Sequence, residues 1–138
     1  MRNLKYLLIG IASIVFISAG NAQETGWSEP VSIDSINTGG NVRSPSISSD
    51  GLKLYYSAEG PNGYSDLFLS YWNGQRWSAG ENLGNPPNSN LIERHPSISN
   101  DGNTLYFARY GGEGSYGVYD IWKSEWNEDS GSWEQAEN

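Results

Sequence analysis

The stretch Arg43-Ser-Pro-Ser-Ile-Ser-Ser-Asp-Gly-Leu-Lys-Leu-Tyr-Tyr56 returns 51 residues later, without a gap, as Arg94-His-Pro-Ser-Ile-Ser-Asn-Asp-Gly-Asn-Thr-Leu-Tyr-Phe107. Both copies end in a short apolar and aromatic run of the kind found in strands. Asp50-Gly51 and Asp101-Gly102 precede these runs, and Asp-Gly favours a tight hairpin turn. Each copy therefore predicts a β-hairpin.

The repetition extends along the chain from these hairpins. Asp66–Trp72 corresponds to Asp120–Trp126, now 54 residues apart, and Trp77–Asn82 corresponds to Trp133–Asn138. The three extra residues fall in the glycine-rich stretch 111–117, where a loop absorbs an insertion at little entropic cost. The chain thus contains two repeats of about 50 residues, which is the size of a unit of four antiparallel strands.

Eight strands and one leading strand are expected. In the first repeat they cover residues 45–49, 53–58, 66–72 and 76–82; in the second, residues 96–100, 104–109, 119–126 and 132–137; the leading strand covers residues 27–33.

The motif Pro-Ser-Ile-Ser-x-Asp-Gly-x-x-Leu-Tyr-aromatic, followed by a glycine-rich loop and Asp-hydrophobe-aromatic, resembles the WD40-like (TolB-type) β-propeller repeat of exported bacterial proteins. Gly111–Gly114 followed by Tyr119–Trp122 is similar to another form of that repeat. The resemblance implies an all-β fold. Residues 23–138 would be a partial β-propeller, with two four-stranded antiparallel blades at about 43–84 and 94–138 plus the leading strand, as part of a larger propeller.

In that family the leading strand joins the last blade and locks the ring, and a closed ring usually needs about four to eight blades. Three explanations for two blades stay open. The chain is a fragment of a longer protein, it completes a ring by self-association, or two blades persist as a small sandwich.

The first 22 residues have the features of a secretory signal peptide. Arg2 and Lys5 supply the positive start, Tyr6–Ile17 is mostly apolar, and Gly20–Ala22 places small residues at the cleavage site. We expect cleavage to leave no membrane span, and the product to be periplasmic, associated with the outer envelope, or secreted.

Acidic residues dominate the 138-residue chain, with 16 Asp and Glu against 8 Lys and Arg and a formal charge of −8. Loss of the leader removes two cations and leaves −10, a charge that repels nucleic acid. The absence of cysteine excludes disulfides, zinc–thiolate sites and thiol nucleophiles.

The aspartates that recur in both repeats are expected to be structural. The position of Asp50 and Asp101 before Gly51 and Gly102 is explained by turn geometry rather than by catalysis or calcium binding. Asp66 and Asp120 each follow a glycine-rich loop, and we expect them to accept hydrogen bonds from loop amides. We therefore expect six residues to have structural roles in the turns and repeats: Asp50, Gly51, Asp101, Gly102, Asp66 and Asp120.

Arg43 and Arg94 are the candidate ligand-binding cations. They recur just before the first strand of each repeat, near the expected channel mouth, where a carboxylate could accept bidentate hydrogen bonds. The competing interpretation is a salt bridge with Glu93 or with a neighbouring blade. The loop tyrosines that are candidates for ligand contact are Tyr64, Tyr110 and Tyr116.

His95 is the only histidine, so no metal pair is expected, and neither a catalytic residue nor a cofactor is predicted. The leading hypothesis is a non-catalytic binding or scaffolding module of the cell envelope. Its partners would be proteins or peptidoglycan-associated molecules, a class implied by the resemblance. Two alternatives remain: a fragment of a propeller-fold glycoside hydrolase or lyase of sialidase-like type, and a truncated remnant without a function of its own.

Overall fold

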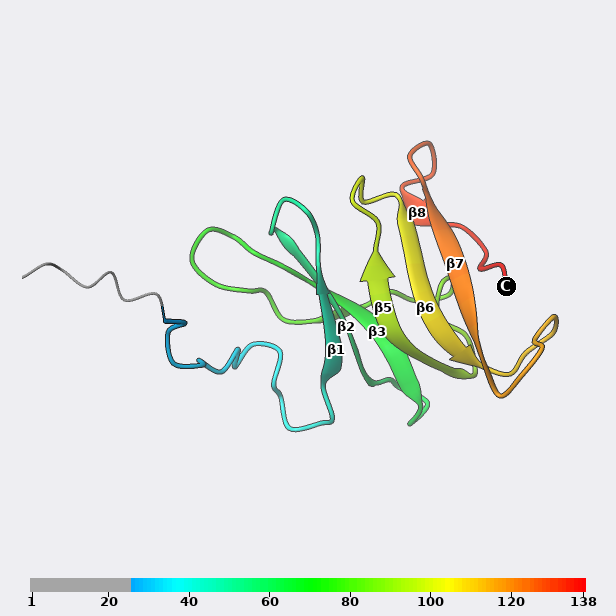
Figure 1. The fold of residues 1–138 in the computed structure, drawn as a ribbon, viewed down its shortest axis with the longest axis horizontal. Helices are drawn as coiled ribbons and strands as arrows, with labels where there is room; N and C mark the ends of the chain where they lie inside the picture. Colours follow the sequence, from blue (N-terminus) through cyan, green and yellow to red (C-terminus); the bar gives the residue numbers. More distant parts are fainter. Residues whose placement is uncertain (1–25) are drawn as a thin grey trace, which may run out of the picture. The chain divides into compact units, whose positions relative to one another are not determined.

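The computed structural model describes residues 26–138, so the predicted leader at residues 1–22 lies outside the described residues. The chain divides into two compact units, Met1–Pro30 and Val31–Asn138. The described part of the first unit, residues 26–30, has no regular secondary structure, whereas the second unit contains every strand of the residues that the structure describes (Figure 1). Among residues 26–138 there is no helix with the length and apolar character needed to cross a membrane.

The second unit consists of two four-stranded antiparallel sheets, and each sheet has its strands in sequence order. The strands of the first sheet are β1 (Arg43–Ile47), β2 (Lys53–Glu59), β3 (Ser65–Tyr71) and β4 (Glu81–Asn82). Those of the second are β5 (Ile92–Ile98), β6 (Thr104–Tyr110), β7 (Tyr119–Asn127) and β8 (Ser132–Trp133). The prediction of an all-β chain with two four-stranded antiparallel sheets is confirmed.

The first and fourth strands of each sheet differ from their predicted bounds. β1 ends at Ile47 and β5 at Ile98. The residues that follow, Ser48 and Ser99, belong to the turns, where their hydroxyl oxygens accept hydrogen bonds from the amides of Lys53 and Thr104. The two-residue strands β4 and β8 are shorter than expected. Isolated bridges extend these edges, Trp72 with Trp77 and Lys123 with Glu137, as do single backbone hydrogen bonds such as that from Leu83 to Leu67.

The leading strand predicted over residues 27–33 is wrong, because these residues have no strand pairing. A strand needs a hydrogen-bonded neighbour for its backbone groups. In the residues that the structure describes, each sheet already has its own fourth strand. Trp27 and Val31 are correspondingly exposed.

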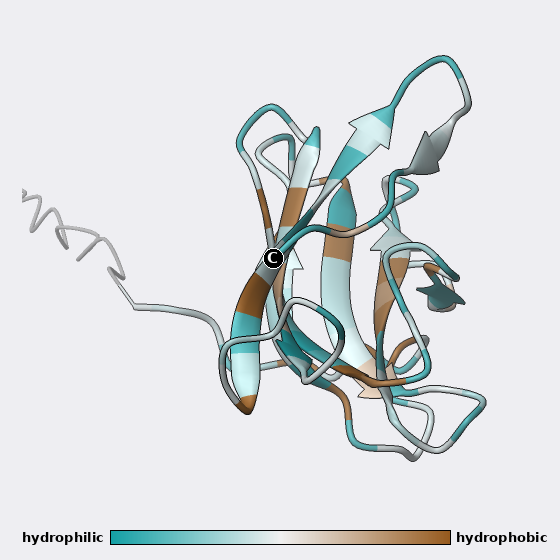
Figure 2. Cartoon of the chain, turned by 90° about the vertical axis from the view of Figure 1, so that its right-hand side faces the viewer, coloured by the Kyte–Doolittle hydropathy of each residue, from teal (hydrophilic) through white to brown (hydrophobic). Residues whose placement is uncertain are grey.

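The main core lies between the two sheets. One face of the first sheet contributes Tyr55, Leu67 and Leu69, and the second sheet contributes Leu105, Phe107, Trp122 and Trp133 from its facing side. Strand β5 packs against β1, β2 and β3, so the second sheet lies directly on the first. Figure 2 shows the apolar segments along the strands and the hydrophilic residues in the turns. We call this face-to-face packing the internal contact.

A smaller core covers the opposite face of the first sheet. Leu54 and Tyr56 are buried there beneath Ile36, with Ile33 and Val42 packed against them. As a result β2 is buried along four consecutive residues, on both faces of the sheet. The equivalent strand β6 instead alternates between buried and exposed residues. The first sheet is therefore covered on two sides and the second on one.

Candidate functional site

The Asp-Gly turns are built identically in the two repeats. Asp50 Oδ1 accepts hydrogen bonds from Ser48 Oγ at 2.5 Å and from the Leu52 amide at 2.9 Å, while Gly51 has a φ of 72°. Both hydrogen bonds favour the ionised carboxylate, so they hold the pKa of Asp50 below its usual value. This carboxylate organises the backbone of the turn.

The second turn repeats that geometry. Asp101 Oδ1 accepts from Ser99 Oγ at 2.5 Å and from the Asn103 amide at 3.1 Å, and Gly102 has a φ of 77°. The same two hydrogen bonds lower the pKa of Asp101. In both repeats, hydrogen bonds within the turn already occupy the aspartate that the sequence singles out.

Asp66 and Asp120 occupy equivalent positions but have different surroundings. Asp120 Oδ2 accepts from Ser115 Oγ and from the amides of Tyr116 and Gly117, as expected for a carboxylate that holds a glycine-rich loop. These bonds lower its pKa, the Ser115 bond most.

Asp66 makes no such bonds to loop amides, and for this residue the expectation is wrong. Its Oδ2 accepts from Asn82 Nδ2 at 2.7 Å, while its Oδ1 is buried without a partner. The carboxylate fills the space beside Gly60, where a Cβ would lie 2.0 Å from Oδ2. Burial raises the pKa of Asp66, and the Asn82 hydrogen bond opposes that rise.

A β-bulge interrupts the first strand of each sheet next to the candidate arginines. The pairing register shifts between Arg43 and Ser46 in β1 and between Arg94 and Ser97 in β5. Bulges bend a strand and redirect its side chains. Each arginine is thus the last residue before a bulge.

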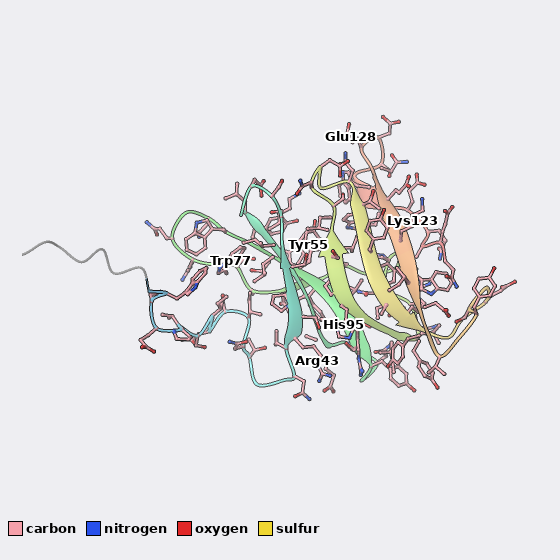
Figure 3. The ribbon with its side chains drawn as sticks, in the orientation of Figure 1. Arg43, Tyr55, Trp77, His95, Lys123 and Glu128 are labelled. Atoms are coloured by element: carbon pink, nitrogen blue, oxygen red, sulfur yellow. The ribbon has the colours of Figure 1, made fainter. Side chains whose placement is uncertain are left out.

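The residues inside the two bulges meet each other. Ser44 and His95 have φ values of 56° and 55°, in the left-handed region, and Ser44 Oγ lies 2.7 Å from His95 Nδ1. Figure 3 shows Arg43 and His95 at one end of the sheets, with Glu128 at the opposite end. The bulges therefore bring together the ends of β1 and β5 that carry the two arginines.

Arg43 and Arg94 line one pocket of about 150 Å³, together with Asn41, Glu59, Tyr64 and Ser65. In the described residues neither arginine forms an ion pair. Arg94 Nε and Ser65 Oγ are shielded from solvent and have no hydrogen-bond partner. The structure thus groups two arginines and two unpartnered polar atoms around one small cavity, with Glu59 as the acid in its lining.

The predicted salt bridge between Arg94 and Glu93 is not formed. Glu93 Oε1 instead accepts from Arg109 Nε at 2.8 Å and from Ser89 Oγ at 2.5 Å, inside the protein. Arg94 Nη1 donates to the hydroxyl of Tyr119 at 3.4 Å. Its guanidinium charge is left without a carboxylate among residues 26–138.

The three candidate tyrosines do not converge. Tyr64 lines the arginine pocket. Tyr110 packs edge-on against Tyr119, with ring centroids 5.3 Å apart, and Tyr119 is the residue that Arg94 contacts. Tyr116 is 94% exposed on the glycine-rich loop and does not line the arginine pocket.

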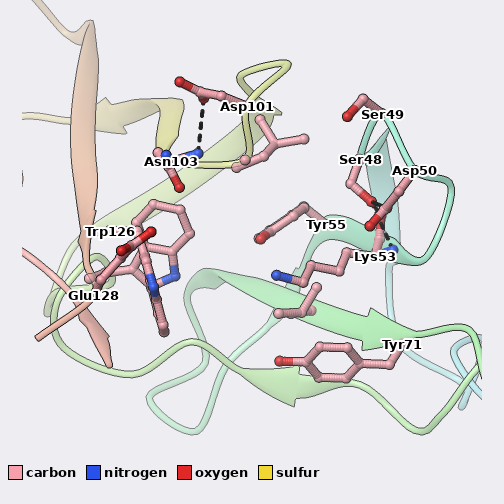
Figure 4. Close-up of a pocket in the computed structure, with 14 residues that line it drawn as sticks. Ser48, Ser49, Asp50, Lys53, Tyr55, Tyr71, Asp101, Asn103, Trp126 and Glu128 are labelled. Atoms are coloured by element: carbon pink, nitrogen blue, oxygen red, sulfur yellow. Dashed lines mark hydrogen bonds between the residues drawn. The ribbon is translucent and has the colours of Figure 1, made fainter. Parts of the chain in front are cut away.

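Sequence reasoning missed a second cavity, of about 280 Å³, between the sheets at the end that carries the Asp-Gly turns. Lys53, Tyr55 and Tyr71 point into it from the first sheet, and Trp126 and Glu128 approach from the second (Figure 4). Burial raises the pKa of Tyr55 to about 12, so its hydroxyl stays protonated. The lining joins residues far apart in sequence, so no single motif marks this cavity. The recurrence of the Asp-Gly turn was the one sequence feature that could have pointed to it.

Asp50 and Asp101, two of the carboxylates that line this inter-sheet cavity, do not have the properties of a glycosidase acid. Such an acid needs a carboxyl group whose pKa is raised so that it can donate a proton near neutral pH. The hydrogen bonds at Asp50 and Asp101 lower their pKa values instead. Residues 26–138 also contain no cluster of three or more histidine and carboxylate side chains that could hold a metal ion.

Comparisons with protein families and curated sequences identify no family for this chain. No protein-family model matches the chain, and no curated protein sequence matches it.

Proposed function

We propose that this protein is an exported, non-catalytic binding or scaffolding module of the cell envelope, built from two blades of a WD40-like (TolB-type) β-propeller. Two observations support the blade assignment: each repeat forms a four-stranded antiparallel sheet in sequence order, and the sheets pack face to face. The leader-like residues 1–22 support export to the periplasm, the outer envelope or the medium. The partner is a protein or a peptidoglycan-associated molecule that presents a carboxylate.

The pocket shared by Arg43 and Arg94 carries this proposal. Guanidinium groups bind carboxylates through two parallel hydrogen bonds. The two arginines come from equivalent positions of the repeats and lack carboxylate partners among the described residues. A ligand carboxylate would supply the missing acceptor, and Tyr64 would flank it.

The net charge of the protein restricts the ligand. A surface with twice as many acidic as basic residues repels extended polyanions. A single carboxylate can still bind, because the contact is local and the pocket is small. Peptide termini and the stem peptides of peptidoglycan fit this requirement better than nucleic acid or polyphosphate.

Calorimetric titration with soluble peptidoglycan fragments that carry free peptide carboxylates tests the proposal. The same fragments with their carboxylates converted to amides are the ligand control. We expect the free acids to bind and the amides to bind at least tenfold more weakly, since charged hydrogen bonds each contribute about 1.5–3 kcal/mol. Equal affinity for acids and amides, or no binding of either, would overturn the assignment of this ligand.

Matched variants locate the site. Arg43→Ala combined with Arg94→Ala should abolish binding. Arg76→Ala removes an exposed arginine from outside this pocket and should leave the affinity unchanged. Arg94→Lys keeps the charge but loses the planar fork, so an intermediate affinity is expected. Binding that persists in the double variant would show that another surface takes the ligand.

Export is tested by fractionating cells that produce the chain from Met1 and sequencing the N-terminus of the purified protein. We expect Gln23 as the first residue and recovery outside the cytoplasm. Cytoplasmic protein that still begins at Met1 would contradict the proposal.

A further inference from the structure

The two sheets use opposite faces at the internal contact, which makes the contact head-to-tail. The first sheet presents Tyr55, Leu67 and Leu69, whereas the second presents Leu105 and Phe107, which correspond to Leu54 and Tyr56 on the other face of the first. A head-to-tail contact between equivalent units leaves one copy of each surface unused. The unused surfaces can therefore be identified by position.

The outer face of the second sheet is the unused copy of the surface that the first sheet buries. We define the outer face as Tyr106, Ala108, Ile121 and Lys123, the equivalents of Tyr55, Ser57, Leu67 and Leu69. Tyr55 and Leu67 are 2% and 0% exposed, whereas Tyr106 and Ile121 are 45% and 66% exposed. Lys123 is held at one side by Glu125 and Glu137, leaving the tyrosine and the isoleucine as the apolar centre.

The backbone edge beside the outer face is also unused. In the first sheet Asn88 spans the edge of β3, where its Oδ1 accepts from the Leu67 amide at 2.7 Å and its Nδ2 donates to the Leu67 carbonyl at 2.9 Å. Asn88 is 4% exposed, so this pair of bonds is buried in the internal contact.

The equivalent edge lies at Ile121. Lys123 exchanges two backbone hydrogen bonds with Glu137 on the edge of β7 remote from β6. Alternate residues of a strand direct their amide and carbonyl groups to the same edge, so those of Ile121 point there too. No hydrogen bond from residues 26–138 reaches them at that edge.

The complementary surface is present at the other end of the unit. Asn37 corresponds to Asn88, is exposed, and makes only a 3.4 Å side-chain contact with Ser32 Oγ. Ile47 corresponds to Ile98, which packs against the main core, yet Ile47 is 56% exposed. A mostly apolar hollow beside Asn37 is lined by Ile33, Leu54 and Tyr56, and Leu54 is the cross-strand partner of Ile47.

We propose that a second copy of this chain binds the outer face head-to-tail and repeats the internal contact. Asn37 of the second copy forms hydrogen bonds with the backbone amide and carbonyl of Ile121, as Asn88 does with those of Leu67. The surface around Ile47 of the second copy covers Tyr106 and Ile121. The occupant is a second copy because the complementary surface belongs to this chain and the internal contact shows how the surfaces fit. This inference is independent of the arginine pocket and of its ligand.

Analytical ultracentrifugation of the chain expressed from Met1 and purified tests the proposal. We expect a weight-average mass that rises with concentration to at least twice the mass of one chain. Ile121→Lys should leave a monomer, because the side chain that becomes buried now carries a charge. Gln135→Lys adds the same charge at an exposed site whose equivalent, Ala79, stays exposed, and should associate normally.

A mixing experiment distinguishes head-to-tail binding from a symmetric dimer. Ile121→Lys blocks the outer face and Ile47→Lys blocks the opposite surface, so each variant alone should be monomeric. Mixed, they should form a 1:1 dimer, since each retains the surface that the other has lost. A symmetric dimer through the outer face would leave Ile47→Lys associated by itself, which would overturn the head-to-tail geometry.

Asn37→Ala tests the role of the asparagine. It should weaken association about fivefold or more, because two hydrogen bonds to the Ile121 backbone are lost, each contributing about 0.5–1.5 kcal/mol. Unchanged association in Asn37→Ala would contradict the proposed edge contact. A wild-type protein that stays monomeric up to its solubility limit would overturn the whole proposal.

Discussion

Ser44 and His95 stand 51 residues apart at the same position of the two repeats, and they hydrogen-bond to each other at 2.7 Å. Each is a non-glycine residue with a φ near 55°, inside a β-bulge. Ser49 and Asn100, also equivalent, meet again further along, where Ser49 Oγ donates to the Asn100 carbonyl at 2.7 Å. Equivalent positions of the two repeats, in β1 and β5 and in the turns that follow them, thus face each other along the internal contact.

The left-handed backbone at Ser44 reverses the usual ranking of glycine and alanine. Glycine in a strand is normally less stable than alanine by about 0.5–1 kcal/mol, but glycine adopts a positive φ without a steric penalty. We expect Ser44→Gly to be more stable than Ser44→Ala by about 1 kcal/mol, because both lose the hydroxyl and only alanine keeps the strain. Urea denaturation of the two variants measures this difference.

Ser97 provides the control for this comparison. It is exposed and lies in β5 without a positive φ. There Ser97→Gly should be less stable than Ser97→Ala. The same order of stability at both positions would contradict the role assigned to the Ser44 backbone.

The repeat predicted the sheets because it is a local property of the sequence. Asp-Gly turns and apolar-aromatic runs define hairpins, and hairpins define antiparallel neighbours. The convergence of Arg43 and Arg94 on one pocket depends on bulges and on sheet packing, which no short segment encodes. The predicted strand at residues 27–33 failed for a related reason, since a strand is stable only beside a partner.

The repeat pattern does not predict the environment of residues at positions where the two repeats differ. Glu93 and Arg109 form a buried ion pair, yet their equivalents Val42 and Ala58 are apolar. Nothing in the local pattern marks these two charged residues as buried. The same holds for Asp66, which makes no hydrogen bond to its preceding loop, whereas its counterpart Asp120 accepts three hydrogen bonds at Oδ2 from the loop before it.

Asp66 and Asp120 should give opposite dependences of stability on pH. The folded protein lowers the pKa of Asp120 from its ordinary value of 3.8, so this carboxylate contributes stability above that pH and loses it as the pH falls. The folded protein raises the pKa of Asp66 from 3.8, so ionisation of this group disfavours folding as the pH rises through the raised value.

Two variants isolate these contributions. Between pH 3 and pH 7, which span the ordinary aspartate pKa of about 3.9, the stability of the wild type relative to Asp120→Asn should increase. Its stability relative to Asp66→Asn should decrease over the same range. Urea midpoints measured at several pH values test both slopes, and slopes of the same sign would contradict the assigned environments.

Asn88 should contribute much more to folding than its counterpart Asn37. Asn88→Ala leaves the buried amide of Leu67 without its partner, which costs about 1–3 kcal/mol, whereas the Leu67 carbonyl keeps the hydrogen bond from the Leu83 amide at 3.0 Å. Asn37→Ala, at an exposed site, should change monomer stability by less than about 0.5 kcal/mol. Denaturation at concentrations where the protein is monomeric makes the comparison. Equal losses would show that Asn37 is already engaged within its own chain.

The buried ion pair of Glu93 and Arg109 should make protein stability sensitive to the loss of either charge alone. Arg109 stacks over Trp122 with its guanidinium carbon 4.5 Å from the ring centroid, and its Nη2 donates to the Pro87 carbonyl at 2.7 Å. Glu93→Leu alone leaves this guanidinium buried without a carboxylate partner, so we expect the free energy of unfolding to fall by about 3–5 kcal/mol.

Replacement of both charged residues should restore most of that loss. Glu93→Leu with Arg109→Met fills a similar volume without charge, and such exchanges of buried ion pairs are often neutral or stabilising. Thermal unfolding of the single and double variants measures the coupling between the two sites. A double variant as unstable as the sum of both single variants would show that the residues act separately. A double variant close to the wild type would show that the pair is not required for stability, consistent with the apolar residues Val42 and Ala58 at the same positions of the first repeat.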